Sequence, residues 1–348
     1  MNARIDPSCE PNGSPLRGTR RPQVVIVGAG IAGLTAARLL PPGFDVVILD
    51  KGRGVGGRLA TRRMGDATFD HGAQFLTART DAFTGTVDDL LDGGVVRPWF
   101  DGRPDGDRPS DGEGHTRFCG TVSMNAIAKH LAAGLDVRTA TLVETLVHDG
   151  DRWAVRLADG TALEADAVVA TAPVPQTLAL LSNGDVDLSV SDRAALDAIE
   201  YDPCLALMVA LDGPSGIAAP GAVRRSDGPI KWMADNQAKG VSTSPAVTIH
   251  ACADFSRQRW DDDLDAIVGE LLDAAALHSS PLSDGVQLQR WRYARPSTTS
   301  EEPCRVLTGL PPIVCAGDAF GGPRVEGAAI SGAAAAAVLI DAFGGQPN

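Results

Sequence analysis

The stretch from Val24 to Arg58 constrains the fold of this chain more than any other. Its apolar start, residues 24–27, has the composition of a buried parallel strand, and Gly28, Gly30 and Gly33 follow where a strand must turn into a helix. The first glycine permits a tight turn, the second lets a phosphate approach the backbone, and the third lets the helix pack closely on the strand. The spacing predicts a dinucleotide-binding βαβ unit.

An acidic residue stands where such a unit needs one. The predicted helix runs from about Ile31 to Leu40, and Pro41-Pro42 ends it. A second apolar strand, residues 46–49, then ends at Asp50, whose carboxylate we expect to bind a ribose 2′-hydroxyl. The helix N-terminus offers free N–H groups to the phosphates. Strand, glycines, helix and acid therefore all predict one nucleotide site.

A second glycine cluster indicates which dinucleotide is bound. Gly56 and Gly57 stand directly before Arg58, whereas a site for NAD alone needs no glycines there. The alternative is a flexible loop without a ligand. This Gly-Gly-Arg resembles the signature of the FAD-binding, amine-oxidase-like flavoproteins. The resemblance implies that the chain passes close to the flavin diphosphate, with the arginine as a fixed cation beside it, and that the cofactor is FAD.

The composition bounds the possible partners. The 348 residues suffice for two packed lobes, and 44% hydrophobic with 22% charged residues is typical of a soluble globular protein. The 31 basic and 44 acidic residues give a net charge of −13. This excess argues against binding to nucleic acid or to an anionic membrane, although a local basic pocket for an anionic substrate stays open.

The cysteines and the apolar segments indicate a cytoplasmic protein. Six cysteines are scattered without metal-ligand spacing, so we expect reduced thiols and no metal site. Residues 1–21 lack an apolar core and are expected to be a disordered leader rather than a signal peptide. The most apolar segment, residues 327–343, is interrupted by Ser331, Gly332 and Asp341, and we expect it to fall short of a membrane span.

A polar run between aromatic residues follows the glycine cluster. Asp70-His71-Gly72-Ala73-Gln74 suggests a tight turn that brings backbone beside a ligand, and His71 either orders this turn or takes part in catalysis. From Gly57 to Phe75 the sequence resembles the renalase-like flavoproteins. In that family the corresponding segment lies at the flavin, which implies that Gln74 and Phe75 line the cofactor.

The middle of the chain predicts a return to the cofactor domain. Residues 97–117 indicate an irregular insertion, and residues 137–170 have the alternation of a small antiparallel sheet. Within that sheet, Val143 stands where the resembled flavoproteins present backbone to the adenine. The strand that ends at Ala170 leads into residues 171–175, a proline-rich return that these flavoproteins share.

Residues 176–300 form the best candidate for a substrate lobe, with the strands and the amphipathic helix of an α+β domain. Three clusters stand out, and core packing or a surface hydrogen bond explains each alone. Their order is similar to that of renalase-like sequences, so the resemblance extends over residues 24–333. Gln237 departs from the serine usual in that family, which bears on substrate fit. The clusters contain Trp232, Asn236 and Lys239; His250; and Trp291, Arg292 and Tyr293.

The closing signature is an apolar strand that ends at Gly317-Asp318, followed by a helix that opens near Glu326. An acid at a strand end can bind the ribityl or phosphate end of FAD, and a helix N-terminus can stabilise negative charge on the reduced ring. The alternative is a strand and helix that only complete the sheet. The distance in sequence from Gly28 fits FAD threaded across a whole domain.

The sequence therefore predicts an α/β fold in which a Rossmann-type FAD-binding domain (residues 22–75, 118–180 and 300–345) is interleaved with an α+β substrate domain (residues 76–117 and 181–299). The predicted cofactor-binding residues are Gly28, Gly30, Ile31, Ala32, Gly33, Asp50, Lys51, Arg53, Gly57, Arg58, Gln74, Phe75, Val143, Gly317, Asp318, Val325, Glu326, Gly327 and Ala328. The predicted catalytic residues, which would shape and polarise the substrate pocket, are Asn236, His250, Trp232, Trp291 and Tyr293.

The chemistry follows from one cofactor site. No second GxGxxG follows a strand, so the substrate itself must reduce the flavin. The resemblance implies noncovalent FAD, hydride transfer to flavin N5, and reoxidation by O2 to H2O2. Bacterial relatives oxidise the 2- and 6-dihydro isomers of NAD(P), small molecules that need no base because hydride loss alone restores aromaticity. The alternatives are an amine oxidase or desaturase on the same fold, and a noncatalytic FAD-fold binding protein.

Overall fold

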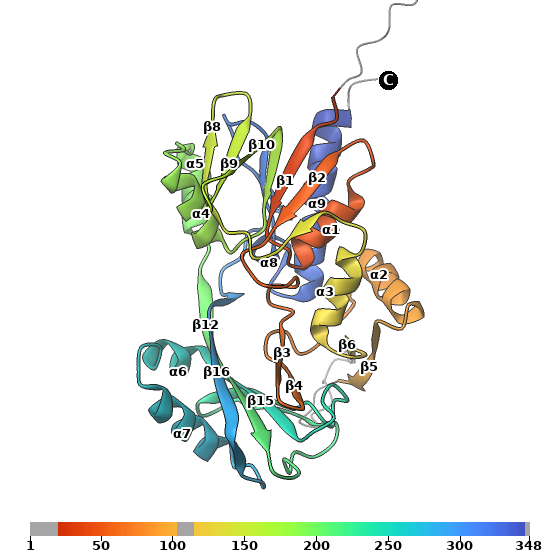
Figure 1. Cartoon of the computed structure of the whole chain (residues 1–348), viewed down its shortest axis with the longest axis vertical. Coiled ribbons are helices and arrows are strands. Elements are labelled where there is room, and N and C mark those ends of the chain that lie inside the picture. Colours follow the sequence, from red (N-terminus) through yellow and green to blue (C-terminus); the bar gives the residue numbers. More distant parts are fainter. Residues whose placement is uncertain (1–19, 103–114, 345–348) are drawn as a thin grey trace, which may run out of the picture.

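A computed structural model describes residues 20–102 and 115–344, so nearly all of the predicted leader lies outside the described residues. The chain forms two lobes, and two long strands, β12 (Tyr201–Leu211) and β16 (Pro281–Pro296), run from one lobe into the other (Figure 1). These two strands pair with each other along most of their length, with a shift of register between Asp202 and Cys204.

The first lobe is built on a six-stranded sheet in the order β17-β18-β11-β1-β2-β7. Its strands are parallel except for β17, which pairs antiparallel to β18. Their bounds are β1 (Gln23–Val27), β2 (Asp45–Leu49), β7 (Val137–Arg138), β11 (Ala167–Ala170), β17 (Arg305–Val306) and β18 (Ile313–Cys315). Successive residues of β1 point into two different cores, so both faces of the sheet are covered.

Helices cover one face of this sheet and a smaller sheet covers the other (Figure 1). The first layer contains α1 (Ile31–Leu39), α2 (Asp81–Asp92), α3 (Met124–Ala132) and α9 (Val325–Gly344). The second contains β8 (Val143–His148), β9 (Trp153–Leu157), β10 (Ala162–Ala165), α4 (Val174–Asn183) and α5 (Val190–Asp197). The short helix α8 (Asp318–Gly321) follows β18. This arrangement confirms the predicted Rossmann-type α/β fold.

The second lobe is an antiparallel sheet in the order β13-β14-β15-β12-β16, with β13 (Ala222–Arg224), β14 (Ile230–Asp235) and β15 (Ala246–Ala251). Alternate residues of β12 pack on α6 (Ala253–Gln258) and α7 (Leu264–Ala275). The opposite face of the sheet packs on the hairpin of β3 (Thr61–Met64) and β4 (Ala67–Asp70), with Phe69 against Met208. The hairpin after the glycine cluster therefore joins the two lobes. Which residue ranges form each domain stays a prediction.

Two expectations from the sequence were wrong in detail. The segment 97–117 is not wholly irregular, because β5 (Val96–Asp101) and β6 (Thr116–Gly120) pair as an antiparallel ribbon; its residues 103–114 lie outside the described part. Residues 137–170 do not form one small sheet, because β7 and β11 join the parallel sheet. Strand β7 joins the parallel sheet because it pairs with β2 at the sheet edge. A strand of two residues is too short for its sequence to predict which sheet it joins.

The last helix, whose apolar segment was expected to fall short of a membrane span, reaches the length of one. By length and composition α9 could cross a membrane, and 44% of its most apolar window is buried inside the protein. Its small side chains pack closely on α1, where Gly332 would place a Cβ 2.1 Å from the carbonyl oxygen of Ala32. Such packing also makes a long apolar helix a core element of a globular fold.

A buried ion pair fixes the hairpin against the second lobe. The Nζ of Lys239 lies 2.8 Å from the Oδ2 of Asp70, and both side chains are fully buried. The other carboxylate oxygen accepts hydrogen bonds from the Oγ1 of Thr61 (2.6 Å) and the backbone N–H of Met124 (3.0 Å). The ammonium also lies 4.9 Å from the ring centre of Trp99. Both charges are thus fully compensated, as buried charges must be.

Replacing one partner of this pair should destabilise the protein strongly. Lys239→Met leaves the carboxylate of Asp70 buried without its cation, and we expect the free energy of unfolding to fall by about 3–5 kcal/mol. Urea denaturation followed by circular dichroism measures the loss. Lys129→Met, at an exposed position on α3, is the matched control and should change stability by less than about 0.5 kcal/mol. Equal stability of the two variants would contradict the assigned role.

Candidate active site

A cavity of about 1290 Å³ lies between the lobes. One end of the cavity, called its upper end, lies in the first lobe, where the parallel strands β1, β2 and β11 end. The other, called its lower end, is formed by the sheet of the second lobe. Ligands of α/β sheets bind at the carboxyl ends of the strands. Because pockets for one drug-sized ligand measure about 300–1,000 Å³, this cavity has room for a large cofactor and a further small molecule.

The three glycines after β1 have different roles. A Cβ on Gly28 would lie 2.5 Å from the Oγ1 of Thr171, and a Cβ on Gly33 only 2.1 Å from the carbonyl oxygen of Gly28. Gly30 lines the cavity, and a Cβ there would have no heavy atom within 4 Å. The outer two glycines therefore allow close packing, whereas the middle one keeps space open for a ligand. The helix α1 begins there without a side-chain cap, so its first N–H groups face the cavity as an anion site.

Asp50 is held in place at the end of β2. Its Oδ2 accepts a hydrogen bond from the N–H of Ala29 and its Oδ1 one from the N–H of Gly52, both at 2.7 Å. The carboxylate lines the cavity beside the glycine turn. The open space at Gly30, the uncapped helix and this fixed acid fit the phosphates and the ribose of a dinucleotide such as FAD.

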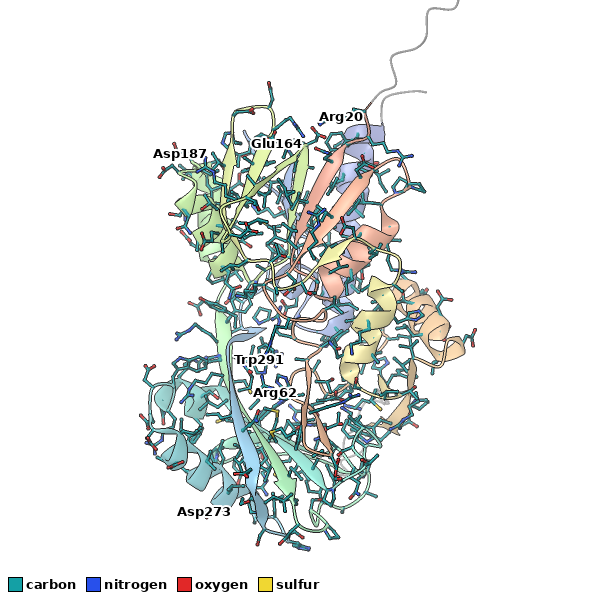
Figure 2. All side chains as sticks on the ribbon, in the orientation of Figure 1. Arg20, Arg62, Glu164, Asp187, Asp273 and Trp291 are labelled. Atoms are coloured by element: carbon teal, nitrogen blue, oxygen red, sulfur yellow. The ribbon has the colours of Figure 1, made fainter. Side chains whose placement is uncertain are left out.

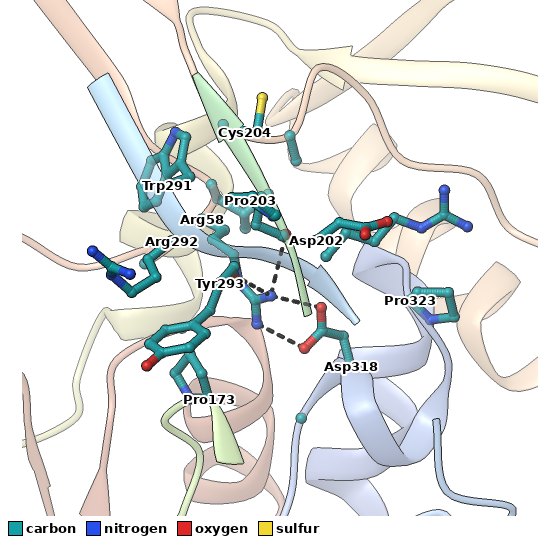
Figure 3. Close-up of a pocket in the computed structure, with 18 of the residues that line it drawn as sticks. Arg58, Pro173, Asp202, Pro203, Cys204, Trp291, Arg292, Tyr293, Asp318 and Pro323 are labelled. Atoms are coloured by element: carbon teal, nitrogen blue, oxygen red, sulfur yellow. Dashed lines mark hydrogen bonds and ion pairs between the residues drawn. The ribbon is translucent and has the colours of Figure 1, made fainter. Parts of the chain in front are cut away.

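An ion pair brings three distant segments together at the middle of the cavity (Figure 3). Arg58 binds Asp318 through two hydrogen bonds of 2.7 Å, and its Nη1 also lies 3.3 Å from the carbonyl oxygens of Tyr293 and Ala294. The two side chains are 29% and 12% exposed. A bidentate arginine–carboxylate pair fixes the orientation of both groups. The second glycine cluster, β16 and the closing signature thus meet at one point.

The lower wall of the cavity, formed by His71, His250 and Trp291, is held by hydrogen bonds to one carbonyl group. The backbone oxygen of His71 accepts from the Nε1 of Trp291 (3.0 Å) and from the Nε2 of His250 (3.1 Å). The imidazole of His71 stacks on the indole of Trp291, with ring centres 5.4 Å apart and planes 20° apart. In Figure 2, Trp291 and Arg62 lie between the two lobes. Strands β15 and β16 therefore position the turn after β4 at the cavity.

Both histidines of this wall are neutral at pH 7. Burial lowers the pKa of His71 from 6.5 to about 4, and the nearby Arg62 and His250 lower it further against the opposing effect of Asp70. Burial also lowers the pKa of His250 to about 4, aided by Lys239, although the bond to the carbonyl of His71 opposes the shift. These rings can exchange hydrogen bonds with a ligand without carrying charge.

Most of the predicted site residues line this one cavity. They are Gly28, Gly30, Ile31, Ala32, Asp50, Lys51, Gly57, Arg58, Val143, Trp232, His250, Trp291, Tyr293, Gly317, Asp318, Val325 and Ala328. Sequence reasoning missed further lining residues, among them Thr171, Pro173, Arg225, Arg295 and Arg324. Thr171 and Pro173 follow a parallel strand, a position that could have indicated them. Among the described residues, no group of three or more His, Cys, Asp or Glu side chains could hold a metal ion.

Other predicted residues do not line the cavity: Gly33, Arg53, Gln74, Phe75, Asn236, Glu326 and Gly327. Asn236 is fully buried; its amide oxygen accepts from the N–H of Asp70 and its Nδ2 donates to the Oγ1 of Thr248 (2.9 Å). This placement argues against the expected contact of Asn236 with a substrate. The Nε2 of Gln74 likewise donates to the carbonyl of Asp70 (2.6 Å).

Glu326 has a structural partner rather than a place on the cavity wall. Its Oε1 accepts hydrogen bonds from the N–H groups of Arg79 (2.9 Å) and Thr80 (2.8 Å), just before α2, and the residue is 5% exposed. The carboxylate therefore joins the N-termini of α9 and α2, where the helix dipoles favour a negative charge. The expected cofactor contact of Glu326 is not supported by this geometry.

Comparisons with known proteins agree with the fold. Residues 104–340 match the family described as flavin containing amine oxidoreductase, and residues 26–90 match the NAD(P)-binding Rossmann-like domain. Renalase of Mus musculus is 26% identical over 327 residues, which cover 86% of this chain and 93% of that protein.

Solved structures of low identity share the fold. A putative protoporphyrinogen oxidase from Exiguobacterium sp. 255-15 has a TM-score of 0.64 at 16% identity, covering 94% of this chain and 99% of the other. A putrescine oxidase with bound putrescine has a TM-score of 0.65 at 15% identity, covering 92% and 99%.

The roles of the glycines can be separated by substitution. Gly28, Gly30 and Asp50 form a cradle for the dinucleotide. Gly30→Ala adds a methyl group to open space in this cradle, so we expect FAD binding to weaken by at least about tenfold, with little change in the stability of the apoprotein. Gly33→Ala should instead destabilise the apoprotein, because its Cβ would overlap the carbonyl of Gly28. FAD titration and thermal unfolding of the apoprotein measure the two effects.

The matched control for these variants is Gly269→Ala. This residue lies on α7, where a Cβ would meet no heavy atom within 4 Å, so FAD affinity should stay unchanged. Unchanged FAD affinity in Gly30→Ala would contradict the role of Gly30 as the open point of the cradle.

The two neutral histidines predict a loss of stability in acid. Because their pKa values in the folded protein, about 4, lie below the ordinary 6.5, the unfolded chain binds protons more readily as the pH falls from 6.5 towards 4. We expect the free energy of unfolding to be lower by about 3–4 kcal/mol at pH 5 than at pH 7.5, measured by urea denaturation. The doubly substituted variant His71→Phe, His250→Gln should show a smaller difference; an unchanged difference would contradict the assignment.

Proposed function

The chain belongs to the family of flavin containing amine oxidoreductases, and we propose that it oxidises the 2- or 6-dihydro isomers of NAD(P) with dioxygen as electron acceptor. It is an FAD-dependent oxidoreductase, and the resemblance to the renalase-like flavoproteins supports this choice of substrate. In this proposal the lobe with the parallel sheet holds FAD and the lobe with the antiparallel sheet holds the substrate.

The observation that carries the proposal is the neutral, flat lower wall of the cavity. Stacked rings of His71 and Trp291 lie beside the imidazole of His250, and both imidazoles are uncharged at pH 7. A dihydropyridine becomes aromatic by loss of a hydride alone, so its oxidation needs no charged base. A wall of neutral rings can orient such a heterocycle for hydride transfer to the cofactor without a charged group beside it.

Each group of residues has a part in this proposal. The cradle at Gly28, Gly30 and Asp50 binds the dinucleotide part of FAD, and Arg58 with Asp318 holds the middle of the cavity. When bound, FAD supplies the hydride acceptor N5 and passes the electrons to O2. The net reaction converts dihydro-NAD(P), O2 and a proton into NAD(P)⁺ and H2O2. Trp291 and His250 would position the ring that loses the hydride.

A basic lining supports an anionic substrate. Arg225, Arg292, Arg295 and Arg324 all line the cavity, and in the described part of the chain none of the four has a carboxylate within 4.0 Å. Their charge contrasts with the net charge of −13 of the whole chain. Arginine recognises phosphate through paired hydrogen bonds, so these side chains fit the pyrophosphate of a second dinucleotide.

Anaerobic mixing tests the proposal. The purified holoenzyme is mixed with 2- and 6-dihydro-NAD(P), and separately with common amines, while the flavin absorbance near about 450 nm is followed. We expect rapid bleaching by a dihydronicotinamide isomer, and return of the colour with release of H2O2 when air is admitted. The KM for this substrate should rise with salt, because screening weakens the attraction of arginines for phosphate.

Two outcomes would contradict the proposal. Bleaching by amines alone would assign the site to amine oxidation, and a flavin that neither class of compound bleaches would exclude these substrates. The ordinary dihydronicotinamide, 4-dihydro-NAD (NADH), is the matched control substrate, because it has the same charge and size and differs only in the position of the added hydrogen.

A further inference from the structure

The hydrogen-bond pattern at the lower wall defines the proton positions of His250. Its Nε2 donates to the carbonyl oxygen of His71, so in the neutral ring the proton lies on Nε2 and Nδ1 carries a lone pair. In the described part of the chain, Nδ1 has no hydrogen-bond partner from the protein. His250 lines the cavity and therefore presents an acceptor there.

The neighbouring His71 leaves the other ring nitrogen, Nε2, for a ligand. Its Nδ1 is buried and has no hydrogen-bond partner among the described residues, and the residue is 4% exposed. A buried N–H without an acceptor is rarer in proteins than a buried acceptor without a donor, which places the single proton on Nε2. The ring is fixed by its stacking on Trp291 and lines the cavity, so His71 presents a donor.

We propose that His71 and His250 form a neutral donor–acceptor pair that binds a primary carboxamide of the substrate. The Nε2–H of His71 would donate to the amide oxygen, and the Nδ1 of His250 would accept from the amide N–H. This inference rests on the proposed function and deepens it, because it makes the two histidines determinants of specificity for amides over carboxylates.

A carboxylate fits this pair poorly. It has no proton to offer the lone pair of His250, so that lone pair would face a negatively charged oxygen. Of the cations near the two rings, Lys239 binds Asp70, and the Arg62 guanidinium lies 3.1 Å and 3.3 Å from the side-chain oxygens of Gln289 and Gln287. With pKa values of about 4, neither imidazole supplies a positive charge at pH 7.

The imide edge of the flavin has the same donor–acceptor chemistry as a carboxamide. The position of the pair favours the substrate, because His250 belongs to β15 of the second lobe and both histidines lie at the lower wall with Trp291. The FAD affinity of variants at these histidines distinguishes the substrate carboxamide from the imide edge of the flavin.

Binding can be measured without turnover. The holoenzyme is titrated with NAD⁺ and with nicotinic acid adenine dinucleotide, which differs from it by a carboxylate in place of the carboxamide, and the perturbation of the flavin spectrum is recorded. We expect NAD⁺ to bind at least about 100-fold more tightly at pH 7.5, because a site built for an amide rejects an analogue that leaves its groups unpaired. Equal affinities would overturn the proposal.

Three variants test whether the two rings cause the preference for NAD⁺ over the carboxylate analogue. His250→Gln can keep the donor to the carbonyl of His71 but removes the acceptor Nδ1. His71→Phe keeps the stacked ring but removes both nitrogens, whereas His71→Gln restores a donor. We expect the first two to reduce the preference for NAD⁺ about tenfold or more and His71→Gln to recover part of it. His130→Gln, at an exposed site on α3, is the control and should keep the full preference.

The affinity for FAD separates the substrate from the flavin as the partner of the pair. If His71→Phe and His250→Gln weaken FAD binding or shift the flavin potential but leave the preference for NAD⁺ intact, the pair serves the flavin and the proposal is overturned. Failure of the proposed function is distinguishable: tight, amide-selective binding of NAD⁺ without oxidation of any dihydro isomer would support the carboxamide site and refute the reaction.

Discussion

The buried ion pair between Asp70 and Lys239 is the interaction on which the site depends. It satisfies two charges that have no access to water, and it connects the hairpin of the first lobe to the loop after β14 in the second. The next residue along the chain, His71, presents its carbonyl to Trp291 and His250. The position of the lower wall relative to the cofactor cradle therefore follows from a contact between two residues that do not line the cavity.

The cofactor half of the site could be predicted because its determinants are local. The turn at Gly28, the uncapped helix and Asp50 lie within one short βαβ unit, where each residue type has a geometric reason at its position. The same holds for the fold of the first lobe, whose strands are apolar on both faces. The exceptions are β7 and β11, which were expected in the smaller antiparallel sheet.

The substrate half could be predicted only in part, because its contacts join residues far apart in sequence. Trp291 bonds to a carbonyl 220 positions away, and no local pattern encodes that distance. Residue type alone also cannot tell whether a buried polar group faces a ligand or the protein. Asn236 and Glu326 were expected at ligands, yet both satisfy backbone N–H groups between elements. His71, whose role the sequence left open, reaches the cavity instead.

The two strands that run between the lobes set the mechanical character of the molecule. Domains joined by single flexible linkers can rotate freely, but β12 and β16 pair with each other along most of their length, with a shift of register between Asp202 and Cys204 beside the cavity. A paired ribbon resists stretching and in-plane bending more than a single linker does, so the two lobes are held together by backbone hydrogen bonds as well as by packing.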